Sequence, residues 1–190
     1  MKSYLITDPK YYSSDPKQFI QILDNVLEKQ RVDYLCFRDK SSPNLEKLVK
    51  SFIFFCKKRK INHIMINSHI DLAIKYKAFG VHLNSNQFDL IKKAKDFGLF
   101  VMVSCHSLEE ISQAKSLGAD GVTYSPIFAT PNKGIPKGVK ALDEALKVAD
   151  GMMLFALGGI ISHKEIEQLK TTNISGFASI RYFIEENSIL

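Results

Sequence analysis

The sequence contains little cysteine and no long apolar run. Its three cysteines, Cys36, Cys56 and Cys105, are an odd number and lack zinc-site spacing, so we interpret them as reduced thiols. No stretch reaches the roughly 18 consecutive apolar residues that a membrane-spanning helix needs. The opening residues, MKSYLITDPKYY, lack the long apolar region and cleavage site of a secretory signal. These absences predict a cytoplasmic protein that has no membrane partner.

The excess of positive charge does not indicate a nucleic-acid partner. The formal net charge is +6, but the lysines are spread over expected helices, as in Lys57-Lys58 and Lys92-Lys93, without an aromatic RNA-binding motif beside them. Solvated helix faces, or an anionic small-molecule substrate, explain the charge better. We therefore expect no nucleic acid among the partners, and a homo-oligomer stays open.

Strands and helices are expected to alternate along the whole chain. With 190 residues, 45% of them hydrophobic, the chain suits one domain spanning residues 1–190. Apolar, β-branched or aromatic runs predict strands at 3–8, 34–39, 63–67, 80–83, 100–105, 121–127, 153–159 and 176–180. Amphipathic periodicity predicts helices at 16–30, 44–58, 71–77, 88–98, 107–118, 141–149, 162–172 and 181–187.

Eight successive strand–helix units predict an α/β protein that is a single TIM (β/α)8 barrel. Right-handed crossovers make the sheet parallel, and eight of them favour closure over an open sheet. The chain is short for this fold, so short loops are required, and the longest is expected at 128–140. Catalytic groups of such barrels lie on the loops that follow the strands.

The residues at these strand ends are cationic and rich in hydroxyls and amides. Arg38 and Lys40 lie two residues apart, so an extended chain points them the same way. Lys133 follows the sixth strand and Arg181 follows the eighth. Arginine forks, lysine charges and glycine N–H groups suit phosphate, so two separated cationic groups indicate two phosphorylated moieties.

Each of these features also has an ordinary structural interpretation. Gly158-Gly159 fits the phosphate-binding turn of TIM barrels, but such a pair can be a simple turn. Arg38 and Lys40 can be surface charges, and His106 can cap a helix. The joint occurrence at successive strand ends is the stronger signal.

The chain resembles the thiamine-phosphate synthase/TenI family over essentially its whole length. The pieces that carry the resemblance are YLCFRDK (34–40), INSHIDLAIKYKAFGVHL (66–83), SCHSLEEISQAKSLGADGVTYSPIFATPNKG (104–134) and LGGI (157–160). The third is the most specific, because the family synthase has a Gly-Pro-Ile-Phe-x-Thr strand end followed by a lysine-bearing loop, where SPIFATPNK stands here.

The resemblance implies a reaction that joins hydroxymethylpyrimidine diphosphate to thiazole phosphate and releases diphosphate. It further implies the role of each matching residue. Lys133, Arg38 and Ser104 would be catalytic, with Ser104 near the pyrimidine and the two cations on the diphosphate. The implied substrate-binding residues are Lys40 and Asn67 for the diphosphate, and Thr130, Asn132 and Gly159 for the thiazole phosphate. Arg181 is a further substrate-binding candidate on its own chemistry, as a cation at the last strand end beside the start of a helix.

Several positions depart from the family pattern. Cys36 replaces a glutamine, and Ser68 and Gln87 stand where the synthase has magnesium-binding aspartates. We therefore expect no resident metal and no tightly bound cofactor, with Mg²⁺ arriving only alongside the diphosphate substrate. Pro126 occupies the position at which TenI, a thiazole tautomerase, has its catalytic histidine. Arg181 occupies a position at which the synthase has a small residue. Three hypotheses remain open, namely a synthase-like transferase, a tautomerase-like isomerase and a non-catalytic phosphate-ligand binder.

Overall fold

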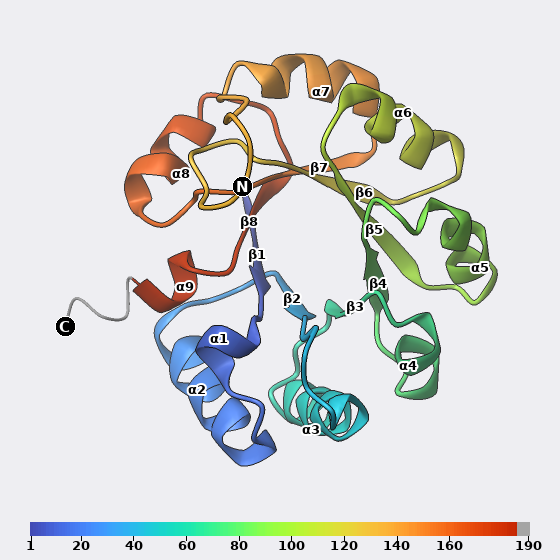
Figure 1. Cartoon of the computed structure of the whole chain (residues 1–190), viewed down its shortest axis with the longest axis vertical. Helices are drawn as coiled ribbons and strands as arrows, with labels where there is room; N and C mark the ends of the chain where they lie inside the picture. The colour runs from blue at the N-terminus through green and yellow to red at the C-terminus, as the bar shows by residue number, and fades with distance from the viewer. Residues whose placement is uncertain (186–190) are drawn as a thin grey trace.

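Eight parallel strands close into a barrel in strictly sequential order (Figure 1). The computed structural model describes residues 1–185. Each strand is hydrogen-bonded to the next, and β8 returns to β1, so the predicted TIM barrel is confirmed. The strands are β1 (Lys2–Ile6), β2 (Tyr34–Phe37), β3 (Ile64–Asn67), β4 (Gly80–Leu83), β5 (Phe100–Cys105), β6 (Gly121–Tyr124), β7 (Met153–Leu157) and β8 (Gly176–Ser179).

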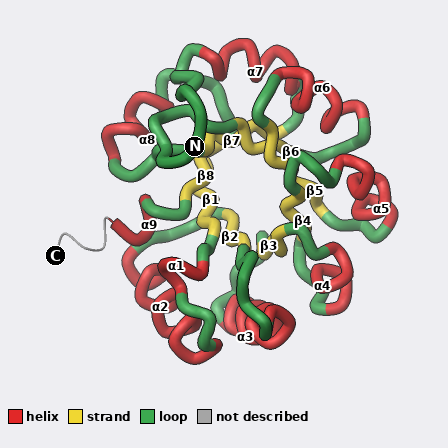
Figure 2. Tube along the Cα trace, viewed as in Figure 1, coloured by secondary structure: helices red, strands yellow, loops and turns green. Residues whose placement is uncertain are grey.

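The helices form a ring outside the strands, as Figure 2 shows. They are α1 (Pro9–Tyr12), α2 (Pro16–Lys29), α3 (Leu45–Lys58), α4 (Ile70–Lys75), α5 (Ile91–Asp96), α6 (Leu108–Ser116), α7 (Ala141–Ala149), α8 (His163–Leu169) and α9 (Tyr182–Glu185). The helix predicted at 88–98 is divided into a short 3-10 turn, η1 (Phe88–Leu90), and α5. The terminal helix predicted at 181–187 begins at Tyr182, and its last two residues lie outside the described part. Among the described residues, no helix combines the length and apolarity needed to cross a membrane.

Side-chain caps fix where several helices begin. The Asp15 carboxylate accepts hydrogen bonds from two backbone N–H groups at the start of α2. Ser162 and Glu165 form a complete capping box on α8. At the start of α6 only half of a capping box forms, because the Ser107 hydroxyl accepts from the Glu110 N–H at 3.2 Å while the Glu110 carboxylate accepts from the His106 N–H.

Strand alternation divides the core into two layers. One layer fills the barrel interior and consists of Tyr4, Ile6, Tyr34, Cys36, Met65, Met102, Phe155 and Ala178. The other packs between the strands and the helices. All four residues of β2, β4, β6 and β8 are buried, as expected for a parallel sheet covered on both faces.

Aromatic rings occupy the end of the barrel where the strands begin. Tyr34 stacks on His63 with ring centroids 4.5 Å apart, and His63 meets Phe79 at 4.8 Å. Phe79 in turn stacks on Phe100 at 5.1 Å. These rings fill that end of the barrel, so we expect the functional site at the opposite end, where the strands finish.

Candidate active site

Most of the predicted site residues lie at the carboxyl end of the barrel. Asn67 is the last residue of β3, and Ser104 is the penultimate residue of β5. Arg38 follows β2 directly, whereas Gly159 and Arg181 lie two residues beyond β7 and β8. The closed parallel sheet thus brings these five strand ends to one rim.

Arg38 is held by groups at the end of β1. Its guanidinium forms an ion pair with Asp8, and both side chains are 23% exposed. Its backbone N–H donates to the Thr7 hydroxyl at 2.9 Å, and that hydroxyl donates back to the Arg38 carbonyl at 3.2 Å. A ligand that binds Arg38 therefore shares it with the Asp8 carboxylate. The sequence pattern did not indicate this ion pair.

Lys40 is exposed on a loop that is organised by a buried carboxylate. Asp39 accepts hydrogen bonds from the Ser41 and Ser42 N–H groups at 2.9 Å each, and from the Ser42 hydroxyl at 2.6 Å. Burial alone would raise the pKa of Asp39, but these hydrogen bonds outweigh it and lower that pKa. The Asp39 carboxylate thus forms its hydrogen bonds within the loop, and Lys40 faces solvent.

A buried polar column rises inside the barrel beneath Ser104. The Tyr4 hydroxyl lies 3.0 Å from Nδ1 of His82, and the Ser104 hydroxyl lies 3.0 Å from Nε2 of the same ring. Thr123 approaches that nitrogen at 3.5 Å. Burial, assisted by the positive charge of Arg38, lowers the pKa of His82 to about 3, so the ring is neutral near pH 7. This ring fixes the Ser104 side chain.

The loop after β6 is attached to the end of β7. The predicted strand 121–127 ends earlier, at Tyr124, and the loop runs from 125 to 140. The Ile127 N–H donates to the Leu157 carbonyl at 3.0 Å, and the Phe128 N–H donates to the Gly158 carbonyl at 3.0 Å. These bonds hold the first part of the loop against the turn after β7.

Gly158 and Gly159 lie in a space that admits no side chain. Both adopt positive φ angles, +97° and +70°. A Cβ on Gly159 would lie 2.5 Å from the Ala129 carbonyl oxygen, and one on Gly158 would lie 3.2 Å from the Thr130 hydroxyl. Thr130 is therefore beside the glycine turn, whereas Asn132 and Lys133 are exposed further along the loop. The two glycines thus allow the loop after β6 to pack closely against the turn after β7.

Comparisons with known proteins show the family to which this chain belongs. A model of the family described as "Thiamine monophosphate synthase" matches residues 3–183. The chain belongs to this family.

The matches to individual relatives cover most of this chain and most of each relative. A relative from Aquifex aeolicus (strain VF5) is 34% identical over 96% of this chain and 97% of its own. Thiamine-phosphate synthase 1 of the same organism is 28% identical over 94% of this chain and 87% of its own. A solved thiamine phosphate pyrophosphorylase from Pyrococcus furiosus, 23% identical, superposes with a TM-score of 0.79 over 94% of this chain and 85% of that one. This last likeness supports the barrel fold.

Enzymes of the thiamine-phosphate synthase family use Mg²⁺ with a diphosphate substrate, but the residues here do not fit a resident ion. The Ser68 hydroxyl accepts hydrogen bonds from the side-chain amides of Asn67 at 2.7 Å and Asn84 at 3.3 Å. The same Asn84 amide donates to Gln87 at 2.8 Å. All these oxygens are neutral, whereas Mg²⁺ prefers anionic oxygen ligands. Nowhere in residues 1–185 do three His, Cys, Asp or Glu side chains gather as a metal site.

Arg181 lies just beyond the last strand in this thiamine-phosphate synthase relative. β8 ends at Ser179, whose hydroxyl donates to the Ile160 carbonyl at 2.7 Å and so links the ends of β8 and β7. Arg181 is half-buried and precedes α9. The predicted strand 176–180 is thus one residue shorter, and Arg181 directly precedes the short helix.

Replacing Arg181 by serine should weaken the binding of thiazole phosphate. A lost charge-assisted hydrogen bond corresponds to roughly 1.5–3 kcal/mol of binding free energy, measurable by calorimetry. Lys164→Ser, on the exposed face of α8, is the matched control and should bind normally. Tighter binding by Arg181→Ser would show instead that the arginine plugs the phosphate position.

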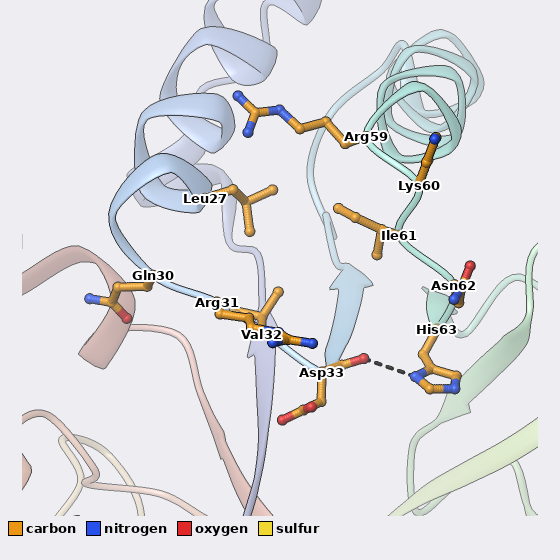
Figure 3. Close-up of a pocket in the computed structure, with 10 residues that line it drawn as sticks. All are labelled: Leu27, Gln30, Arg31, Val32, Asp33, Arg59, Lys60, Ile61, Asn62 and His63. Carbon is orange, nitrogen blue, oxygen red and sulfur yellow. Dashed lines mark hydrogen bonds between the residues drawn. The ribbon is translucent and has the colours of Figure 1, made fainter.

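A hollow at the opposite end of the barrel is a weaker candidate for the active site. It has a volume of about 360 Å³ and lies between the segments that precede β2 and β3 (Figure 3). The side chains of Leu27, Val32 and Ile61 face one another in its middle. Arg59 extends away toward α2, where it forms an ion pair with Asp24 that neutralises its charge.

Proposed function

We propose that this protein binds phosphorylated pyrimidine and thiazole substrates and joins them as a thiamine-phosphate synthase does. The observation that carries the proposal is the attachment of loop 125–140 to the Gly158-Gly159 turn, beside a rim that contains Arg38, Asn67 and Ser104. Family membership supports the same substrates. In this reaction the bond from the pyrimidine methylene carbon to the diphosphate oxygen breaks, and the thiazole nitrogen bonds to that carbon.

The chain's own groups would act mainly by electrostatics and alignment. Arg38, Lys40 and Lys133 would stabilise negative charge as it develops on the leaving diphosphate, and Asn67 would bind it. Ser104, fixed by neutral His82, would orient the pyrimidine ring. The phosphate of the thiazole would rest on the Gly159 backbone with Thr130 and Asn132, which aligns the attacking nitrogen.

Incubation of the protein with hydroxymethylpyrimidine diphosphate, thiazole phosphate and magnesium tests this proposal. We expect thiamine phosphate and diphosphate to appear together, slowly, because the neutral Ser68–Asn84–Gln87 network offers no anionic metal ligand. A parallel incubation with the unaromatised thiazole carboxylate tests for an isomerase. Binding of phosphorylated ligands without either product would identify a non-catalytic binder.

Alanine substitution of Arg38, Lys40 or Lys133 should weaken the binding of hydroxymethylpyrimidine diphosphate. Each change should remove roughly 1.5–3 kcal/mol of binding free energy if the side chain donates a charge-assisted hydrogen bond. Calorimetry on the three variants measures the loss, and Lys147→Ala on exposed α7 is the charge-matched control. Unchanged affinity in all three variants would refute a shared cationic mouth.

A further inference from the structure

The outer face of α3 carries a row of lysines around one exposed aromatic ring. Lys47, Lys50, Phe54 and Lys57 follow one another at intervals of three and four residues, so they lie on one side of the helix. Phe54 is 73% exposed, although the same helix buries its opposite side in the core. An aromatic ring in water among cations serves no packing role, and the barrel mouth does not use it.

This face forms one wall of a groove. The groove lies between α3 and the end of α4, which are neighbours in Figure 1, and it has a volume of about 630 Å³. Ile53, Phe54 and Tyr76 supply apolar lining. The space is sufficient for a large side chain and the backbone that carries it.

The charge of the groove is only partly neutralised from within. Lys75 pairs with Glu46 at 2.5 Å, and Lys57 donates to the Tyr76 carbonyl at 3.1 Å. In the part of the chain that the structure describes, no ion pair involves Lys47, Lys50 or Lys77. The groove thus has apolar lining and several cations that are available to an anionic partner.

We propose that this groove binds an acidic segment of another protein, with a large apolar side chain of the segment against Phe54 and its carboxylates on Lys47, Lys50 and Lys77. Complementary charge guides such an association, and a buried aromatic contact supplies much of its affinity. A groove with one exposed ring suits a peptide better than a bilayer surface. Its two rings, Phe54 and the half-buried Tyr76, do not form a row of stacking platforms for successive bases.

Fluorescence anisotropy with a labelled peptide, in which glutamates flank a central Leu-Phe pair, tests the proposal. We expect saturable binding that weakens as salt rises, because exposed charges are screened. Lys47→Glu with Lys50→Glu, and separately Phe54→Ser, should each weaken binding by about tenfold or more. The charge-matched control, Lys92→Glu with Lys164→Glu, alters lysines outside the groove and should change binding little.

Circular dichroism melting of each variant ensures that only folded proteins are compared, and the exposed positions chosen should tolerate substitution. An absence of peptide binding would overturn the proposal, and so would equal weakening by the control pair. Phosphatidylserine vesicles and a single-stranded oligonucleotide are tested in parallel. Preferential binding of either one that depends on Phe54 and Lys50 would assign the groove to that partner instead.

Discussion

Between pH 6.5 and pH 3 the folded protein should lose roughly 5 kcal/mol of stability through a single side chain, His82. The unfolded chain binds a proton at this residue below about pH 6.5, whereas the folded chain does so only below about pH 3. Within that window the unfolded state holds more protons, so stability is full above it and falls as the pH decreases. The cause is burial of the ring between Tyr4 and Ser104.

Urea unfolding across this pH range, compared with the His82→Gln variant, measures the effect. The variant should show a shallower fall of stability with acidification, and the control His69→Gln, at an exposed position, should retain the wild-type slope. If His82→Gln does not fold, proton NMR of the wild-type imidazole signals reports the titration directly. A buried histidine that titrates near pH 6.5 would contradict the expectation.

Replacing Ser68 and Gln87 together by aspartate should create a magnesium site and raise synthase turnover by about tenfold or more. A tenfold increase requires the activation free energy to fall by only about 1.4 kcal/mol. The two positions are already adjacent, because the Gln87 side-chain amide donates to the Ser68 carbonyl at 3.2 Å. Two carboxylates there would repel each other unless a cation lies between them, which favours ion binding. One aspartate alone should do less.

Magnesium calorimetry and product formation should be measured on the same preparations. Ser68→Asn with Gln87→Asn is the matched control, because it alters both side chains without adding charge, and it should bind no more magnesium than the wild type. Tight magnesium binding by the unaltered protein would contradict this reading of the site. Rapid thiamine phosphate formation without the added aspartates would contradict it equally.

The fold could be predicted from the sequence because its signal is local and repeated. Alternation of apolar runs with amphipathic stretches determines each strand–helix unit, and connection rules leave few ways to arrange eight of them. Strand ends then indicate the rim, where Asn67 and Ser104 lie, and the family resemblance implies their roles. The limits of individual strands were less certain, since residues 125–127 after β6 are apolar or small but belong to a loop. In that loop the Ser125 N–H donates to Cys105 of β5 and the Ile127 N–H donates to Leu157 of β7.

Contacts between distant segments could not be predicted in the same way. Asp8 pairs with Arg38 across 30 positions of sequence, and no spacing rule connects them. His82 stands in the sequence GVHL, where alternation alone cannot show that its partners are Tyr4 and Ser104. Such partners follow from register around the closed barrel, which depends on all strands together.

The burial of the three cysteines makes this chain a convenient background for site-specific labelling. Burial raises the pKa of Cys36 and of Cys105 to about 12, and it also raises the pKa of Cys56. Near neutral pH only about 10⁻⁵ of a thiol with such a pKa is thiolate, the form that reacts with maleimides and oxidants. A cysteine introduced at Ile135, which is 91% exposed on the loop beside Lys133, should therefore take up a fluorophore alone. A probe there would report ligand binding at the barrel mouth without removal of the natural thiols.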